Sequence, residues 1–266
     1  MKKRILGSVD SLEVSAVGYG CMGFSHGYGK CPDKETAINL MRAAYERGCT
    51  FFDTAQSYAD GENEILVGEA VKPFRKNIVL ATKIHIPEEA KNNLGQVLEE
   101  RLDGSLRRLG TDYVDIYYQH RMNENISAEE VAYEMGRLIA KGKIRGYGQS
   151  QSTAHEIIRA NAVTPMTAVQ SEYSIMERSF EKEVIPTCEK LGIGFVAFSP
   201  MASGYLSGKA ITPNDTYHGD DVRRVITRYS PENVRANLPL LDALSAFAEK
   251  KRATTAQIAL AWLLGK

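Results

Sequence analysis

The sequence has few cysteines, no excess of charge of either sign and no long apolar run. Its four cysteines are too sparse for a disulfide framework and lack the spacing of metal ligands, so we expect reduced, mostly buried thiols and no metal site. They are Cys21, Cys31, Cys49 and Cys188. Lysine plus arginine and aspartate plus glutamate each total 33, and this balance gives no electrostatic reason to propose a nucleic acid or an anionic membrane surface as a partner.

Targeting and membrane-spanning signals are also missing from the sequence. The first ten residues, MKKRILGSVD, begin with basic side chains but include no apolar segment of a signal peptide. No stretch approaches the roughly 18 apolar residues that a membrane span requires. We therefore expect a cytoplasmic protein. Hydrophobic residues make up 43% of the 266-residue chain, which is enough for the core of a single domain, residues 1–266.

What the sequence does contain is a repeated alternation of strand and helix. Residues 4–15 indicate a hairpin around Gly7–Ser11 that would cap the fold. Seven strands are predicted at Ser15–Cys21, 49–53, 77–83, 114–120, Ile144–Ser150, Thr167–Tyr173 and Gly194–Pro200. Six helices separate them, at Asp33–Arg47, Asn63–Val71, Leu94–Leu109, Ser127–Lys141, Thr153–Ala162 and Glu177–Leu191. Such alternation implies a parallel sheet, and this many near-equal units favour a (β/α)8 TIM barrel of the α/β class over an open doubly wound sheet.

The alternation stops after the seventh strand. Residues 201–236 are too long for an ordinary connection, and we interpret them as a loop that covers the substrate. Helices at Leu238–Lys251 and Thr255–Leu264 follow, without an eighth strand. We therefore expect an incomplete barrel of seven βα units with an N-terminal hairpin cap.

Polar or aromatic side chains stand at the ends of the predicted strands, where the active sites of barrels lie. They are Asp53, Lys83 and His120 on strands two to four, and Ser150, Gln170 and Phe198 on strands five to seven. Tyr58 follows in the loop after Asp53. Each could have a structural explanation alone, such as an ion pair between Asp53 and Lys83, a hydrogen-bonded histidine or a surface tyrosine. Their coincidence at one edge of the sheet favours a functional site.

These residue types suit proton delivery to a carbonyl oxygen. A phenol is a poor acid near neutral pH unless a neighbouring cation stabilises the phenolate. Lys83 would supply that cation beside Tyr58, while Asp53 would hold Lys83 in place and keep it charged. His120 could donate a hydrogen bond to the oxygen that receives the proton. Addition of hydride to the carbon of the same group would require a nicotinamide cofactor.

One motif is misleading. The segment Gly18-Tyr-Gly20-Cys-Met-Gly23 matches G-x-G-x-x-G and follows a predicted strand, but a dinucleotide-binding fingerprint must also open a helix directly. The predicted helix begins only about ten residues later. We therefore expect these glycines to let the backbone approach a cofactor or to shape the barrel mouth.

Several motifs resemble those of the aldo-keto reductase superfamily, namely FFDTAQSY, LATK, YYQH, VQSEYS and FSPMASGYLSGK. The resemblance covers residues 4–266, and four catalytic residue types occur in order at the expected strand ends. The segments GYGCMGF and RYSPEN look like the bacterial long-loop branches, which include reductases of small aldehydes and ketones. The resemblance implies an NADPH-dependent (β/α)8 reductase whose partner is a small-molecule carbonyl substrate.

Carried over residue by residue, the resemblance implies Tyr58 as the general acid, Lys83 and Asp53 as the pair that tunes it, and His120 as the group that orients the carbonyl. It also implies a set of cofactor-binding residues. They are Gly20, Cys21, Met22, Ser150, Gln151, Gln170, Phe198, Ser199, Met201 and Ser203.

Within this set, the resemblance implies that Ser150 and Gln170 bind the nicotinamide carboxamide. It implies that Phe198 stacks on the nicotinamide ring. The sequence departs from the family at two positions, since the family often has Asn where Gln151 stands and Tyr where Phe198 stands. Phe198 keeps the stacking face and loses only a hydroxyl. Gln151 has the right chemistry but one extra methylene.

The family would continue with an eighth strand and helix, in a region where basic residues bind the adenosine 2′-phosphate. We therefore expect weak NADPH binding and poor discrimination against NADH. Two alternatives to an active reductase remain open. One is a catalytically impaired, truncated barrel, and the other is a non-catalytic regulatory or binding subunit on the same scaffold, as in the potassium-channel β-subunits of this family.

Overall fold

A computed structural model describes all 266 residues, and its main feature is a seven-stranded sheet. The strands lie in sequence order, and β3 to β8 pair in parallel with their neighbours. They are β3 (Tyr19–Gly20), β4 (Phe51–Asp53), β5 (Val79–Ile84), β6 (Val114–Gln119), β7 (Ile144–Ser150), β8 (Ala168–Glu172) and β9 (Gly194–Phe198). This is the (β/α)8 TIM-barrel fold with seven strands present, as the alternation predicts.

The chain forms two compact units, which are described separately. Unit 1 comprises Met1–Ser25, Cys31–Ser171 and Phe180–Val196, and unit 2 comprises His26–Lys30, Glu172–Ser179 and Ala197–Lys266. The single domain expected from the sequence stays a prediction.

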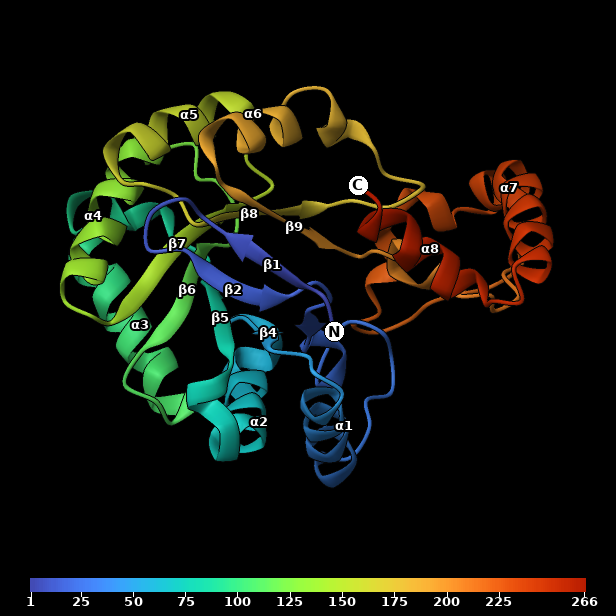
Figure 1. Ribbon diagram of the computed structural model, residues 1–266, viewed down its shortest axis with the longest axis horizontal. Coiled ribbons are helices and arrows are strands. Elements are labelled where there is room, and N and C mark those ends of the chain that lie inside the picture. Colours follow the sequence, from blue (N-terminus) through green and yellow to red (C-terminus); the bar gives the residue numbers. More distant parts are fainter. The chain divides into compact units, whose positions relative to one another are not determined.

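Helices of unit 1 pack around the outside of the sheet (Figure 1). They are α1 (Lys34–Glu46), α2 (Glu62–Val71), α3 (Leu94–Leu109), α4 (Ala128–Ala140), α5 (Ala154–Val163) and α6 (Val184–Leu191). Capping residues fix where several of them begin. Asp33 accepts a hydrogen bond from the backbone of Thr36 at 2.9 Å, and Ser127 forms the expected capping box with Glu130.

A hairpin closes the interior of the sheet. Its strands are β1 (Lys3–Leu6) and β2 (Leu12–Ser15), which pair antiparallel and lie across the sheet in Figure 1. Leu6, Leu12 and Val14 are buried in one apolar cluster with Phe51 of β4 and Ile116 of β6. The hairpin therefore caps the barrel interior, as the sequence predicts, and burial of these side chains contributes about 1.5–3 kcal/mol each.

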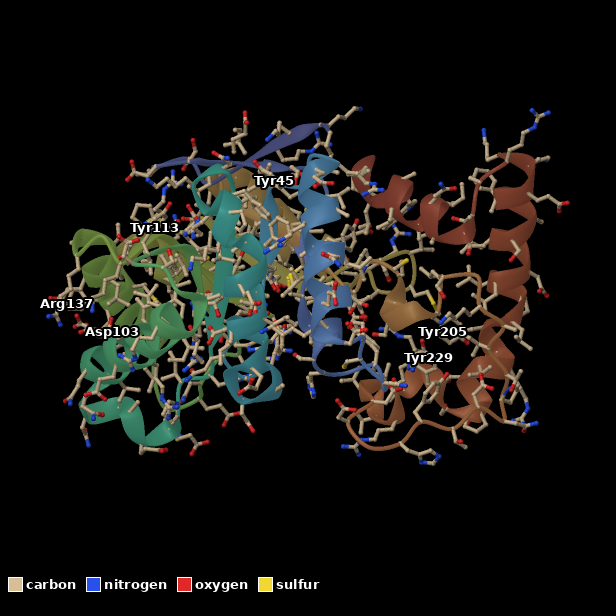
Figure 2. The ribbon with its side chains drawn as sticks, turned by 90° about the horizontal axis from the view of Figure 1, so that it is seen from below. Tyr45, Asp103, Tyr113, Arg137, Tyr205 and Tyr229 are labelled. Carbon is tan, nitrogen blue, oxygen red and sulfur yellow. The ribbon has the colours of Figure 1, made fainter.

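Unit 2 holds the long connection after β9 and two helices, α7 (Pro231–Lys250) and α8 (Thr255–Leu264). Tyr205 and Tyr229 lie side by side in it, with ring centroids 5.2 Å apart (Figure 2). Both rings are buried in an apolar cluster that includes Leu206 and Val234. No helix of either unit combines the length and the apolarity needed to cross a membrane.

The structure corrects three predicted boundaries. Only Tyr19–Gly20 of the predicted strand Ser15–Cys21 joins the sheet, because pairing with β4 covers just two residues. The helix predicted from Glu177 begins at Val184. The predicted loop 201–236 ends at Ser230, where α7 begins. Ser230 is the N-cap of this helix and Pro231 is its first residue, and both residue types are favoured at these positions.

Candidate active site

Lys83 is the centre of the candidate site. The side chain stands on β5 and only 1% of it is exposed. Its ammonium donates to the carboxylate of Asp53, to the carbonyl of Thr54 at 2.8 Å and to the phenolic oxygen of Tyr58 at 3.3 Å. An ammonium has three donors, so these contacts satisfy it completely.

Parallel pairing brings these groups to one edge of the sheet. Asp53 pairs in register with Ala81 of β5, and Lys83 pairs with Tyr118 of β6. Both side chains therefore stand near the carboxyl ends of their strands, as does His120 directly after β6. Tyr58 opens a short 3-10 helix, Tyr58–Gly61, in the loop that follows β4.

Asp53 is held from a second side by Gln170. The Gln170 amide donates to the free carboxylate oxygen of Asp53 at 2.9 Å. These residues belong to β4 and β8, which β5, β6 and β7 separate in the sheet. The contact is possible only because the sheet curves, so the ends of distant strands converge in unit 1.

The protonation of Lys83 depends on two opposing effects. Burial lowers the pKa of an ammonium, but the adjacent Asp53 carboxylate raises it, and the balance leaves the pKa of Lys83 above its ordinary value. Lys83 is therefore charged at neutral pH. The positive charge lies next to the Tyr58 oxygen, where a phenolate would form.

His120 is neutral at physiological pH. Burial is the largest cause and lowers the pKa of His120 to about 2, with further lowering by the positive charge of Lys83 and by His85 and Arg121. Its ring meets that of Tyr58 edge-on, with centroids 5.8 Å apart. The hydroxyl of Ser57 lies 3.4 Å from Nδ1 of His120, so Nε2 carries the proton when Ser57 donates this bond.

Ser150 and Gln170 face one another across β7 and β8. They are paired in register, and the backbone of Gln151 donates to the carbonyl of Gln170 at 3.0 Å. The hydroxyl of Ser150 accepts a hydrogen bond from Arg121 at 3.2 Å. This part of unit 1 therefore presents a hydroxyl and a primary amide, which together can satisfy both the donor and the acceptor of a carboxamide.

The glycine segment before α1 is part of the same edge. Gly20 pairs in register with Asp53, and the backbone of Cys21 donates to the carbonyl of Asp53 at 2.8 Å. A Cβ at Gly20 would meet no atom within 4 Å, whereas one at Gly18 would lie 2.8 Å from the ring of Phe51. Gly20 therefore borders open space. Because α1 begins only at Lys34, the segment does not open a helix directly and is not a dinucleotide fingerprint, as expected. Met22 begins the short 3-10 helix Met22–Phe24.

Strained backbone follows several of these residues. Ala59 and Asp60 come directly after Tyr58, and Gln151 comes directly after Ser150, all with left-handed φ between 47° and 60°. Non-glycine residues adopt this region rarely and at a cost of about 1–3 kcal/mol, and such strain gathers at functional sites.

The remaining predicted cofactor residues belong to unit 2. Phe198 ends β9, and its carbonyl accepts from the backbone of Tyr173 at 3.3 Å. Ser199 and Ser203 are left-handed, with φ of 48° and 58°, and Met201 precedes the 3-10 helix Ala202–Gly204.

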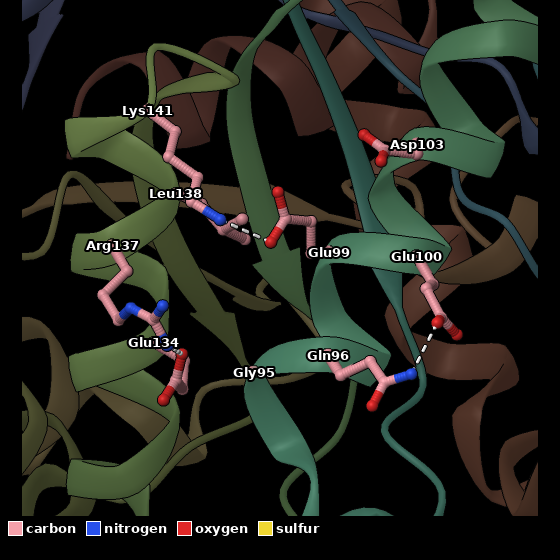
Figure 3. A pocket seen from close by; sticks show the side chains of 9 residues that line it. All are labelled: Gly95, Gln96, Glu99, Glu100, Asp103, Glu134, Arg137, Leu138 and Lys141. Atoms are coloured by element: carbon pink, nitrogen blue, oxygen red, sulfur yellow. Dashed lines mark hydrogen bonds and ion pairs between the residues drawn. The ribbon is translucent and has the colours of Figure 1, made fainter.

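A cavity on the outer helices has a different character. It has a volume of about 500 Å³ between α3 and α4 and is lined by residues such as Glu99, Glu134, Arg137 and Lys141 (Figure 3). Its charged groups pair with each other, as Lys141 does with Glu99 and Arg137 with Glu134. None of the predicted site residues lines it.

Sequence reasoning missed three residues around Lys83 and His120. Thr54 supplies the carbonyl that binds Lys83, and Arg121 contacts Ser150. Asn63 is fully buried, accepts from the Thr54 hydroxyl at 2.6 Å and donates to the carbonyl of Cys21 at 2.9 Å. A signal for Asn63 exists, because an amide on the apolar face of a predicted helix needs buried partners.

Comparison with known proteins identifies the family of this chain. The family model described as "Aldo/keto reductase family" matches residues 16–266. A curated relative from Glycine max, "Probable aldo-keto reductase 1", is 36% identical over 258 residues, which cover 95% of this chain and 74% of the relative.

Solved structures agree with this match. The glycerol dehydrogenase of Gluconobacter oxydans has a TM-score of 0.85 at 26% identity, over 99% of this chain and 82% of that one. An aldo-keto reductase of Klebsiella pneumoniae, solved in complex with NADPH, has a TM-score of 0.75 at 25% identity, over 99% and 82% of the two chains. The chain therefore belongs to the aldo/keto reductase family, a family of oxidoreductases that act on carbonyl compounds.

Proposed function

We propose that this protein is an NADPH-dependent reductase of aldehydes or ketones in which Tyr58 donates the proton to the carbonyl oxygen. The contact of one ammonium, that of Lys83, with both Asp53 and the Tyr58 oxygen carries this proposal. Loss of the phenolic proton leaves a phenolate, and a cation beside it in a buried site stabilises that charge strongly.

The other groups have complementary roles. Asp53 fixes Lys83, and Gln170 fixes Asp53 from the opposite side. Neutral His120 donates a hydrogen bond to the carbonyl oxygen and so orients it without supplying a competing proton. The carbonyl oxygen takes the Tyr58 proton as the carbonyl carbon is reduced, and the product is an alcohol. Solvent then restores the proton on Tyr58.

Each unit contains residues that suit part of the cofactor, and the two sets are considered separately. In unit 1, Ser150 and Gln170 offer the donors and acceptors that a nicotinamide carboxamide needs, and the open space at Gly20 leaves room for a ribose beside Cys21 and Met22. In unit 2, Phe198 offers a stacking face, and Ser199, Met201 and Ser203 offer backbone N–H groups. When bound, the reduced nicotinamide supplies the hydride for the carbonyl carbon. The NADPH complex of the Klebsiella pneumoniae relative supports this choice of cofactor.

The test is replacement of the acid. Tyr58→Phe should lower the rate of aldehyde-dependent NADPH oxidation by roughly 10²–10⁴-fold, as loss of a general acid does, and should leave NADPH affinity near that of the wild type. Tyr133→Phe is the matched control, because Tyr133 is a 60% exposed surface tyrosine on α4. Wild-type turnover in Tyr58→Phe with a panel of simple aldehydes contradicts the proposal. The same assay with NADH measures the expected poor discrimination between the two cofactors.

A further inference from the structure

Arg121 is held at the edge of the candidate site by two hydrogen bonds. Its Nη1 donates to the carbonyl of His120 at 2.6 Å and to the hydroxyl of Ser150 at 3.2 Å. Both bonds use the same nitrogen. The Nε and Nη2 groups of this guanidinium therefore keep donors that no protein atom accepts, on a side chain that is only partly exposed to solvent.

No carboxylate compensates the charge of Arg121. Elsewhere in unit 1, arginines that reach inward meet a buried acid, as Arg75 meets Asp115 at 2.8 Å and Arg108 meets Glu64 at 2.6 Å. The acid at this edge, Asp53, already binds Lys83 and Gln170 with its two oxygens.

The edge around Arg121 consequently carries an excess positive charge. The charges of Lys83 and Asp53 cancel, and burial lowers the pKa values of both His85 and His120, so neither ring is charged at neutral pH. Burial also lowers the pKa of Arg121, although a guanidinium remains protonated in proteins. A partly desolvated cation with free donors gains most from an anion that takes them both.

We propose that Arg121 binds the carboxylate of the substrate, so that the preferred substrates are aldehydes or ketones carrying a carboxylate within a few bonds of the carbonyl. This inference rests on the proposed reductase function. Arg121 directly follows His120, whose ring packs edge-on against that of Tyr58 with centroids 5.8 Å apart. A short oxo acid can therefore place its carbonyl at Tyr58 and His120 and its carboxylate against the guanidinium. Arginine suits this role because its planar donors match the two oxygens of a carboxylate.

The test compares an anionic substrate with its neutral counterpart. Succinate semialdehyde and its methyl ester share the reacting aldehyde and differ in one charge. Wild-type enzyme should have the higher kcat/KM for the acid. In Arg121→Gln, which keeps amide donors for His120 and Ser150 but removes the charge, kcat/KM for the acid should fall on the order of 10- to 100-fold, mainly through KM. The ester carries no anion, so its kcat/KM should fall much less than that of the acid, and the preference for the acid should shrink.

Two further variants complete the design. Arg121→Lys restores the charge without the planar donors and should recover part of the preference for the acid. Arg137→Gln is the control, because Arg137 is 53% exposed on α4 and pairs with Glu134 on the outer surface (Figures 2 and 3). Equal losses for acid and ester, no loss for either, or a change confined to NADPH affinity would overturn the inference.

A binding measurement separates this inference from the reductase proposal. Titration of succinate into the wild type and Arg121→Gln, each with NADP+ present, is followed by calorimetry. Wild-type binding that is lost in Arg121→Gln supports the carboxylate site even if neither aldehyde is reduced. No binding to the wild type overturns the site, while reduction of the neutral ester would leave the reductase proposal standing.

Discussion

The two ends of the parallel sheet each hold a carboxylate in an ion pair, and the two carboxylates differ in burial and in partners. At the amino end, the fully buried Asp115 of β6 pairs with Arg75 at 2.8 Å and Arg145 at 2.7 Å, and it accepts from the backbone of Leu80 at 2.9 Å. At the carboxyl end, Asp53 pairs with Lys83 and Gln170.

Under the proposed function only the carboxyl end has a proton to transfer, because the Tyr58 phenol contacts Lys83 there. The partners of Asp115 are guanidinium groups and a backbone amide, none of which changes protonation near neutral pH. Lys83 instead contacts the Tyr58 phenol, and left-handed residues follow in the same loop. A buried ion pair therefore does not by itself mark an active site in this fold. A titratable hydroxyl beside the pair, held by strained backbone, is the more specific sign.

Replacing Lys83 should have the largest effect, because it removes both functions of the carboxyl-end pair. Lys83→Met should abolish measurable reduction and destabilise the protein by about 3–5 kcal/mol, since Asp53 is left without its cation. The free energy of unfolding is measured by urea titration, alongside aldehyde-dependent NADPH oxidation. The double variant Asp53→Asn, Lys83→Met serves as the control. It should recover much of the stability and none of the activity, and a single variant as stable as the wild type would contradict a buried pair.

Replacing Arg75 should affect stability alone. Arg75→Met leaves Asp115 with Arg145 and the Leu80 amide, so we expect a loss of about 3 kcal/mol, at the lower end for a broken buried pair. The kcat of the folded fraction should match the wild type at a temperature well below the unfolding transition. A fall in kcat as large as that of Lys83→Met would contradict the view that the pair of Arg75 and Asp115 contributes to stability alone.

A smaller effect should appear in the pH dependence of stability. The unfolded chain protonates His120 near pH 6.5, whereas the folded chain keeps it neutral down to a pKa of about 2. The unfolded state therefore binds the extra proton below pH 6.5, and the folded state loses stability as the pH falls. Between pH 6.5 and 5 the loss from this group is about 2 kcal/mol, at about 1.4 kcal/mol per pH unit.

His120→Gln removes this contribution. Urea titrations of both proteins at the two pH values should show a smaller decline for the variant, while the remaining decline comes from other titrating groups. Identical slopes in the two proteins would mean that His120 is accessible to protons in the folded state.

The parts of the candidate site that depend only on strand order could be predicted from the sequence. Asp53, Lys83 and His120 could be placed together because parallel strands bring their carboxyl ends to one edge. The hydrogen bond from Gln170 to Asp53 could not be predicted, because it depends on how far the sheet curves between β4 and β8. The direction of the Arg121 side chain could not be predicted either, since rotamer choice decides whether it meets Ser150 or solvent.

In the fold, too, the features set by local sequence could be predicted, and those set by contacts between distant segments could not. Periodicity locates the strands and most helices, and Ser127 and Asp33 fix helix starts through local hydrogen bonds. The length of β3 depends on pairing with β4 rather than on its own residues, so the prediction overextended it. Ser230 and Pro231 indicate that α7 starts there, as an N-cap and a proline at the first helical position. The sequence analysis nevertheless predicts a later start, because Pro239 lies inside the helix and proline usually ends a helix.

The left-handed residues bear on any attempt to make this protein robust enough for use as a biocatalyst. Replacing such residues with glycine is an attractive route to a higher melting temperature, because it relieves about 1 kcal/mol or more at each position. At Ala59 and Gln151 the same change would free the chain beside Tyr58 and Ser150, so a screen that reads only melting temperature would select less active variants. Asp10 at the hairpin turn and Arg252 after α7 are also left-handed and follow none of the proposed site residues. Those two positions are where the engineer should begin.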